Sequence, residues 1–344
     1  MVRIKKGPSK NISIEDVARL AGVSITTVSR VINKVGTVKE KNRFKVLQAI
    51  KELNYQPSVI AQRLATGKSN VVALVIPRYE GMFYSFYLLE LIRGIGTLCE
   101  VFKLDLLLHL TDSRSPLNLR GLGGIIFADI IGNRYQLESA LNKGIPCVVI
   151  NNNVDDLEVD CISIDNVKGA EMAVDYLVSL GHRRIAHITG DLVTQAASQR
   201  LEGYKRALLR NGLPVEDRFI FKTDYSRGQA RQATEQLLKL SPVPTAVFVA
   251  SDSMALEVMT LARESGKSVP GDLSIVGFDD NPSGLYGPVA LTTVRQPLVK
   301  MAQDSLKRIS VLMQSQPDSR PKVEKIILPV ELIIRESCRR LDSA

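Results

Sequence analysis

Residues 13–33 read SIEDVARLAGVSITTVSRVIN, and this stretch decides the fold of the N-terminal part of the chain. Its apolar residues recur at the spacing of one helix face up to residue 21. Ser13 can cap this helix, and Asp16, three residues later, can complete a capping box. The pattern stops at Gly22, and Ser24 opens a second periodic segment. Two short helices joined by a tight, glycine-containing turn are typical of a helix-turn-helix.

The second helix has an outer face that is unusual for a solvated surface. Its outward positions are Ile25, Thr26, Ser29, Arg30 and Asn33. Polar helix residues most often only face water, but an exposed β-branched apolar residue at the start of such a face needs another explanation. That side chain can contact a thymine methyl group, and an arginine can pair with guanine or with phosphate. The face therefore favours DNA binding.

The positive charge of the protein is concentrated at its N-terminal end. The 344 residues contain 45 Lys and Arg against 36 Asp and Glu. Residues 1–70 hold 14 of the basic residues and 4 of the acidic ones, a net charge of +10, whereas residues 71–344 have a net charge of −1. A basic module on a near-neutral body is typical of a protein that contacts phosphate, on nucleic acid or on an anionic membrane.

Two further helices are expected in the N-terminal part. The first covers residues 39–53 and should close a three-helix core. Its apolar side is formed by Val46, Leu47, Ile50 and Leu53. Pro57 can occupy the first turn of the other helix, over residues 58–65. Because about two turns of helix are unstable alone in water, that helix should form only when it is paired.

From residue 70 onward, apolar strands alternate with helices. Strands are expected at residues 71–77, 104–110, 124–128, 147–150, 184–189, 246–250 and 273–278. Helices are expected at residues 87–102, 169–180, 200–211, 226–240 and 253–265. This alternation predicts an α/β architecture with parallel sheets, whose ligands gather at the carboxyl ends of the strands.

Composition excludes several classes of protein. The content of 45% hydrophobic and 24% charged residues is typical of a folded globular protein. No apolar run reaches the roughly 20 residues that span a bilayer, and the N-terminus lacks the apolar segment of a secretory signal. The four cysteines and three histidines show no metal-ligand spacing. We therefore expect a cytoplasmic protein without metal or cofactor that is not an enzyme.

The N-terminal module resembles that of the LacI/GalR family of bacterial transcriptional regulators. The segments that carry the resemblance are Gly22-Val23-Ser24, Thr27-Val28-Ser29-Arg30, Asn54-Tyr55-Gln56-Pro57 and Ala61-Gln62-Arg63-Leu64. The resemblance implies that Ile25, Thr26 and Arg30 read bases. It implies a hinge helix in which Ala61 and Leu64 enter the minor groove, with Leu64 as a wedge that kinks the duplex. The other implied DNA-binding positions, most of which hold phosphates, are Ser13, Ser24, Thr27, Ser29, Asn33, Thr37, Tyr55, Ser58 and Gln62.

The rest of the chain resembles the effector core of the same family, which shares its fold with periplasmic sugar-binding proteins. Carrying segments are Arg200-Leu201-Glu202-Gly203-Tyr204, Ser251-Asp252-Ser253 and Gly277-Phe278-Asp279-Asp280. The implied fold is a three-helix helix-turn-helix domain at 1–56, a hinge helix and linker at 57–69, a two-subdomain α/β core at 70–338 and a tail at 339–344. The N-subdomain should cover about 70–163 and 296–324, and the C-subdomain about 166–293 and 328–338. Crossovers between them are expected near 163–166, 293–296 and 324–328.

The core resemblance also implies a ligand site in the cleft between the subdomains. Arg200 matches an arginine that clamps effector oxygens, and Asp279 matches a carboxylate that accepts hydrogen bonds from hydroxyl or ring N–H groups. This pair suits a polyhydroxylated ligand, because planar guanidinium geometry selects vicinal hydroxyls. The other expected effector-binding residues are Tyr84, Tyr87, Phe127, Asn151, Tyr225, Ser251 and Gln296.

Several features depart from the family pattern. Ser251 stands where an asparagine is common, and the absence of tryptophan makes Tyr225 the best candidate for stacking on a sugar. Residues 80–87 align loosely with the family. Residues 113–123 replace a full helix, which puts part of one sheet face and of the dimer contact in doubt. His182 is expected to be a structural turn residue.

The sequence thus predicts a DNA-binding regulator, a repressor, that binds a pseudo-palindromic operator as a homodimer and is controlled by a sugar. The end of the chain carries no leucine heptads, which favours a dimer over a tetramer. A purine, a nucleoside or a phosphoprotein corepressor is an alternative effector. The competing class is a sugar-binding protein or sugar enzyme without operator function.

Overall fold

The computed structural model describes residues 12–33, 36–55, 69–79 and 82–341. The chain divides into two compact units, Met1–Ser69 and Asn70–Ala344. Three helices of the first unit are α1 (Ile14–Ala21), α2 (Ile25–Asn33) and α3 (Glu40–Glu52). The expected hinge helix lies outside the described residues, and with it Ser58, Ala61, Gln62 and Leu64.

The start of the first unit follows its local sequence signals. The Ser13 hydroxyl accepts from the backbone N–H of Asp16, and the Asp16 carboxylate accepts from the backbone N–H of Ser13, so the capping box is confirmed. Helix α1 ends at Gly22, whose φ of 65° is a left-handed conformation that glycine adopts without strain. One expected core residue is wrong: Leu47 is exposed, and Ala49 is buried instead. The side of α3 that packs against α1 and α2 is the one that carries Val46 and Ala49.

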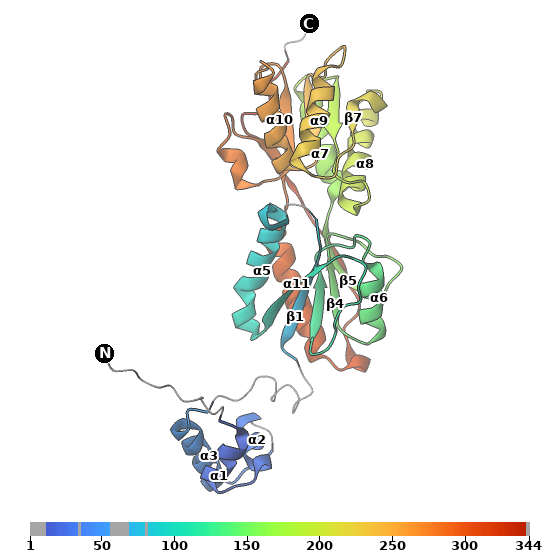
Figure 1. Cartoon of the computed structure of the whole chain (residues 1–344). Helices are drawn as coiled ribbons and strands as arrows, with labels where there is room; N and C mark the ends of the chain where they lie inside the picture. The colour runs from blue at the N-terminus through green and yellow to red at the C-terminus, as the bar shows by residue number, and fades with distance from the viewer. Residues whose placement is uncertain (1–11, 34–35, 56–68, 80–81, 342–344) are drawn as a thin grey trace, which may run out of the picture. The chain divides into compact units, whose positions relative to one another are not determined.

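The second unit contains two six-stranded sheets (Figure 1). The first has the order β11-β5-β4-β3-β1-β2 and the second the order β12-β10-β9-β8-β6-β7. Strands of the first sheet are β1 (Val71–Pro77), β2 (Asp105–Thr111), β3 (Gly124–Phe127), β4 (Cys147–Ile150), β5 (Asp160–Ile164) and β11 (Lys325–Leu328). Strands of the second are β6 (Ile185–Ile188), β7 (Ile220–Phe221), β8 (Ala246–Val249), β9 (Ser274–Asp279), β10 (Thr292–Arg295) and β12 (Glu331–Ile333).

Helices cover the faces of both sheets. The first sheet contacts α5 (Phe86–Phe102), α6 (Arg134–Asn142) and α11 (Leu298–Gln314). The second sheet contacts α7 (Asn166–Ser179), α9 (Arg227–Leu238) and α10 (Asp252–Glu264), and α8 (Gln195–Arg210) lies against α7. Short 3-10 helices are η1 (Met82–Tyr84), η2 (Asp217–Phe219), η3 (Pro282–Leu285) and η4 (Pro317–Ser319). Among the described residues, every helix is too short or too polar to span a bilayer.

The chain passes between the two sheets three times, each time from the carboxyl end of a strand. The crossings follow β5, β10 and β11, at residue 165, residues 296–297 and residues 329–330. Strand β11 pairs with β5, so residues 325–328 belong to the first sheet and the third crossing follows the expected range of 324–328. Strand β12 enters the second sheet from the boundary, so it runs antiparallel to β10, and all the other strand pairs described are parallel.

The end of the core also differs from the expected tail at 339–344. The backbone N–H of Arg339 donates to the Ser274 hydroxyl, and that of Leu341 donates to the carbonyl of Leu180. Residues 339–341 are therefore held on the second sheet. The His182 ring, which is fully buried, bonds Thr245 and the Arg339 carbonyl, a structural role like the one that the sequence predicts.

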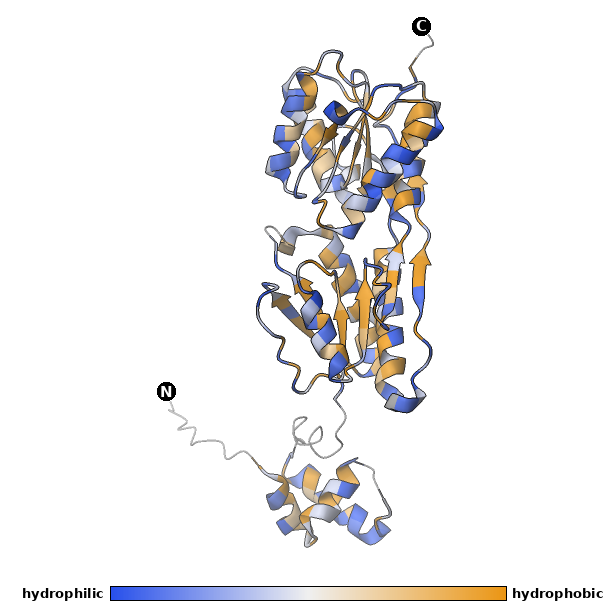
Figure 2. Cartoon of the chain, turned by 90° about the vertical axis from the view of Figure 1, so that its right-hand side faces the viewer, coloured by the Kyte–Doolittle hydropathy of each residue, from blue (hydrophilic) through white to orange (hydrophobic). Residues whose placement is uncertain are grey.

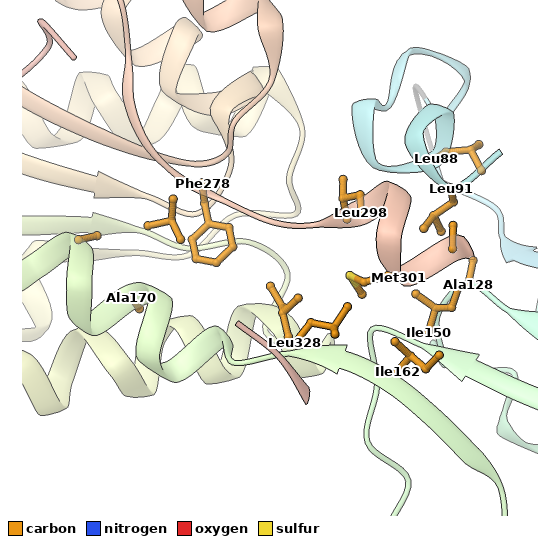
Figure 3. Packing of buried hydrophobic residues seen from close by; sticks show 14 of the residues in the cluster. Leu88, Leu91, Ala128, Ile150, Ile162, Ala170, Phe278, Leu298, Met301 and Leu328 are labelled. Atoms are coloured by element: carbon orange, nitrogen blue, oxygen red, sulfur yellow. The ribbon is translucent and has the colours of Figure 1, made fainter. Parts of the chain in front are cut away.

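Buried apolar residues continue from one subdomain into the other. Strand residues are mainly hydrophobic (Figure 2), and Phe278, Leu328, Leu298 and Met301 belong to one cluster that crosses the boundary (Figure 3). Residues 112–123 form no helix, in agreement with the shortened segment. Their side chains Leu117, Leu119 and Leu122 pack against the sheet face where a helix would lie.

Candidate functional sites

Helix α2 presents the outward face that the sequence predicts. Ile25 is 47% exposed, and Thr26 and Arg30 are exposed beside it. The Ser24 hydroxyl accepts from the backbone N–H of Thr27 and begins the helix. Because the core side chains of α2 are turned to the opposite side, these three residues are free to meet a groove.

The other described DNA-binding candidates surround this face. Asn33 Nδ2 donates to the Ser29 hydroxyl across one helical turn, Thr37 is exposed, and Tyr55 is half-buried against the three-helix core. Ser13 is engaged in its capping box. The three-helix core places the small polar side chains around the exposed helix, as phosphate contacts require.

In the second unit, Arg200 is held rigidly on α8. Its side chain is 4% exposed, Nε donates to Asn166 Oδ1 at 2.9 Å, and Nη1 donates to the Ala250 carbonyl at 2.6 Å. The guanidinium carbon lies 3.7 Å from the centre of the Phe278 ring. A buried arginine fixed on three sides is preorganised to bind oxygen atoms of a ligand.

Asp279, at the end of β9, faces Arg200. Burial raises the pKa of the Asp279 carboxyl, and the nearby Arg200 charge lowers it in part. Gln296 Nε2 donates to Asp279 Oδ1, so the first residue of the second crossing is tied to the site. Asp279 has a φ of 132° and Asp280 a φ of 59°, a strained backbone of the kind found at functional sites.

The Asp252 carboxylate is hydrogen-bonded to the turn after β9 and to β10. It accepts from Thr293 Oγ1 at 2.6 Å and from the backbone N–H of Asn281 at 2.7 Å. Burial and the neighbouring Asp279 charge raise the pKa of the Asp252 carboxyl. Asp252 is therefore a positioning residue that connects α10, the turn after β9 and strand β10.

A third carboxylate, Asp129, reaches the boundary from the first sheet. Its oxygens accept from the backbone N–H of Ile130 at 2.8 Å and from Asn151 Nδ2 at 3.1 Å. Burial raises the pKa of Asp129 to about 6, and the Arg200 charge of the other subdomain lowers it in part. The charge of Arg200 therefore acts on Asp129 across the boundary between the subdomains.

Tyrosines complete the site from both subdomains. The Tyr87 hydroxyl donates to the Ala128 carbonyl, and burial with the Asp129 charge raises the pKa of that phenol. Tyr225 has a φ of 68°, and its ring lies so close to Gly190 that a Cβ there would be 1.9 Å from the ring. Burial raises the pKa of the Tyr225 phenol, and Arg200 lowers it.

The structure brings six of the nine expected effector-binding residues into one network of contacts or charges: Tyr87, Asn151, Arg200, Tyr225, Asp279 and Gln296. Two expected residues lie outside this network. Tyr84 is 91% exposed on η1, because the turn before α5 directs it outward. Phe127 is fully buried in the apolar cluster of the first sheet, because it is the last residue of β3 and faces the core. The Ser251 hydroxyl is used as the N-cap of α10.

Sequence reasoning missed Asp129, Asn166 and Asp252 as parts of the site. Asp129 follows β3 directly, and a polar residue at the carboxyl end of a parallel strand is a signal that could have found it. Asn166 and Asp252 stand at helix N-termini, where such residues are ordinarily caps. Their contacts with Arg200 and with Thr293 depend on the tertiary fold.

Comparison with known proteins decides the family. The family of bacterial regulatory proteins, lacI family, matches residues 13–58, and the periplasmic binding protein-like domain matches residues 174–338. The HTH-type transcriptional regulator DegA of Bacillus subtilis (strain 168) is 35% identical over 342 residues, which cover 96% of this chain and 99% of DegA. This chain belongs to the LacI family. It is a DNA-binding transcriptional regulator and not an enzyme.

Solved structures of LacI-family regulators agree with this assignment. The lac repressor dimer bound to operator and the anti-inducer ONPF is 29% identical, with a TM-score of 0.82, covering 96% of this chain and all of that one. The transcriptional regulator CelR–cellobiose complex is 28% identical, with a TM-score of 0.73, covering 95% of this chain and 99% of that one. The two-part fold expected from the sequence is confirmed.

Proposed function

We propose that this LacI-family regulator is a cytoplasmic repressor that binds a pseudo-palindromic operator as a homodimer, under the control of a sugar bound between the two subdomains. The observation that carries the sugar is the arrangement of Arg200 and Asp279, because a fixed guanidinium beside a carboxylate suits vicinal hydroxyls. The cellobiose bound by CelR supports the same ligand class.

The operator contacts are assigned to α2. Ile25, Thr26 and Arg30 read base edges in the major groove, and the small polar residues around them hold phosphates. The hinge residues Ala61 and Leu64 enter the minor groove. The net charge of +10 on residues 1–70 supplies the electrostatic part of the affinity.

The homodimer is supported by exposed apolar side chains on two neighbouring elements of the core. These are Leu89 and Val101 on α5 and Leu107 and Leu108 on β2. Helix α5 contacts β2 at the edge of the first sheet, and the consecutive Leu107 and Leu108 point to opposite faces of that edge strand. The lac repressor neighbour is a dimer. A twofold-symmetric pair of α2 helices would read two half-sites of opposite orientation.

A salt titration tests the DNA-binding part. Affinity for a duplex that contains the operator should fall steeply as salt rises, because each neutralised phosphate releases counterions. The Arg30→Ala variant should lose preference for the operator over unrelated duplex. A shallow salt dependence, or an unchanged preference in Arg30→Ala, would contradict the proposed readout.

Melting temperatures with added sugars test the effector part. A ligand that binds only the native state raises the melting temperature of the core. Cellobiose and ribose are suitable first probes, each followed by measurement of operator affinity with the sugar present. By reciprocity, a sugar that weakens operator binding must itself bind more weakly to the DNA complex.

A further inference from the structure

The charges at the ligand site are unbalanced. Asp129 of the first subdomain and Asp279 of the second both lie within range of the Arg200 charge, which lowers the pKa of each in part. The neighbouring Arg295 and Arg335 are engaged with Asp280 through ion pairs. Among the described residues, the carboxyls of Asp129, Asp279 and Asp252 therefore outnumber the single Arg200 cation.

The site also contains hydrogen-bond acceptors that lack a donor. Asn151 Nδ2 donates to Asp129, and Gln296 Nε2 donates to Asp279, and these bonds fix which end of each amide is nitrogen. The two remaining amide oxygens, Asn151 Oδ1 and Gln296 Oε1, are buried without a donor. Buried acceptors without a donor are costly, so a ligand that supplies hydrogen-bond donors here gains affinity.

An anionic ligand fits this site poorly. A phosphate or carboxylate offers acceptors and no donors, and it would share a single guanidinium with two carboxylates. Like charges that are held together away from water repel strongly. A hydroxyl group, in contrast, can donate to a carboxylate or amide oxygen and accept from Arg200.

We propose that the ligand is a hydroxyl-rich molecule without an anionic group, held between Asp129 and Asp279, and that Asp129 is a specificity-determining residue that excludes phosphorylated and carboxylated sugars. The inference rests on the proposed function, because it takes the boundary between the subdomains as the effector site.

The test compares sugars that differ only in charge. Glucose, glucosamine, glucose 6-phosphate and glucuronate, together with ribose and ribose 5-phosphate, are titrated into the full-length protein by calorimetry and by melting temperature. We expect binding from the neutral or amino forms and weaker binding, by at least about tenfold, from the matched anions. The binding should disappear in Arg200→Gln.

Two variants, one of them a control, test whether the charge of the Asp129 side chain or its shape sets the preference between sugars. Asp129→Asn keeps the size of the side chain but removes its charge, and it should raise the affinity for the phosphorylated or carboxylated sugar relative to the neutral one. Asp155→Asn removes an exposed acid of the same subdomain and should leave the ratio unchanged. An unchanged ratio in Asp129→Asn would overturn the role of Asp129.

The outcomes distinguish this inference from the proposed function. An anionic sugar that binds at least as tightly as its neutral form, depends on Arg200 and alters operator affinity would overturn the inference and leave the effector site standing. If no sugar of either charge binds in an Arg200-dependent manner, both the charge class and the sugar effector fall, while operator binding is measured independently by the salt titration.

Discussion

The Arg200 guanidinium lies 3.7 Å from the centre of the Phe278 ring, and this stack couples α8 to the end of β9, where Asp279 follows. The same guanidinium bonds Asn166 and the Ala250 carbonyl. Helix α7, the residue after β8 and strand β9 therefore meet at one side chain. The stack and the two bonds use the planar, forked shape of arginine, which lysine lacks.

Arg200→Lys should therefore abolish the response to ligand without loss of DNA binding. A lysine keeps the charge but loses the Asn166 bond and the flat contact with Phe278, and we expect ligand affinity to fall at least about tenfold. The measurement is the ligand-induced rise in melting temperature together with operator affinity. Arg206→Lys, on the exposed side of the same helix, is the matched control. Equal losses in both variants would contradict the assigned role.

Asp129 should make the stability of the core depend on pH. Its pKa of about 6 in the folded protein exceeds the ordinary value of 3.8, so the folded state binds more protons between these values. The free energy of unfolding therefore falls as the pH rises through this window. Asp279 and Asp252 act in the same direction, because burial also raises the pKa of each.

Melting temperatures of the wild type and of Asp129→Asn across this pH window provide the check. The variant should lose less stability on the alkaline side, because an amide has no proton to release. Asp155→Asn should follow the wild-type profile. If the profile of Asp129→Asn is as steep as that of the wild type, Asp129 is already ionised throughout the window.

Ser13→Ala should destabilise the first unit. The hydroxyl accepts from the Asp16 N–H at the start of α1, and loss of such an N-cap costs about 1 kcal/mol. Ser13→Thr keeps the capping hydroxyl and should restore most of the loss. Thermal unfolding followed by operator affinity measures both effects. A threonine variant as unstable as the alanine variant would show that the cap is not the cause.

The helix-turn-helix was predictable because its signals are local. The cap at Ser13, the left-handed turn at Gly22 and the cap at Ser24 depend on residues within one turn, and all three are present. Strands of the core were equally readable, since a strand buried on both faces needs a continuous apolar run, as in β1.

The ligand site was predictable only in part because it is built by contacts distant in sequence. Arg200 and Asp279 were anticipated from the family resemblance. Phe127 is apolar and next to the site in sequence, but the alternation of the strand turns it into the core, and Asp129, two residues later, reaches the boundary instead. Its partner Asn151 is on another strand end, so no short-range pattern could reveal the pair.

Leu64→Ala should weaken operator binding and leave ligand binding intact. Leu64 lies outside the described residues, and its role as a minor-groove wedge is implied by the family resemblance. Without the leucine wedge the duplex is not kinked, and the contacts that the kink allows are lost. Operator affinity and ligand affinity are measured on the same preparation. A parallel loss of ligand affinity would contradict the separation of the two functions.

Two glycines offer substitutions with opposite expected effects on stability. Gly203 lies on α8 one turn after Arg200, and a Cβ there would come within 2.2 Å of the Val167 carbonyl oxygen of α7. Gly203→Ala should therefore force the two helices apart, at a cost of about 1–3 kcal/mol. Gly228, on α9, has open space around it. Gly228→Ala should stabilise the protein by about 0.5–1 kcal/mol, because alanine loses less backbone entropy in a helix.

Denaturant unfolding of the two variants measures the expected loss and the expected gain in the free energy of unfolding. Ligand titration adds a functional readout. Since α8 carries Arg200, the displacement caused by Gly203→Ala should also move the guanidinium away from Asn166 and weaken ligand binding. Gly228→Ala should bind ligand as the wild type does. Equal stability of the two variants would mean that α7 and α8 can separate without cost, in conflict with the close contact between them.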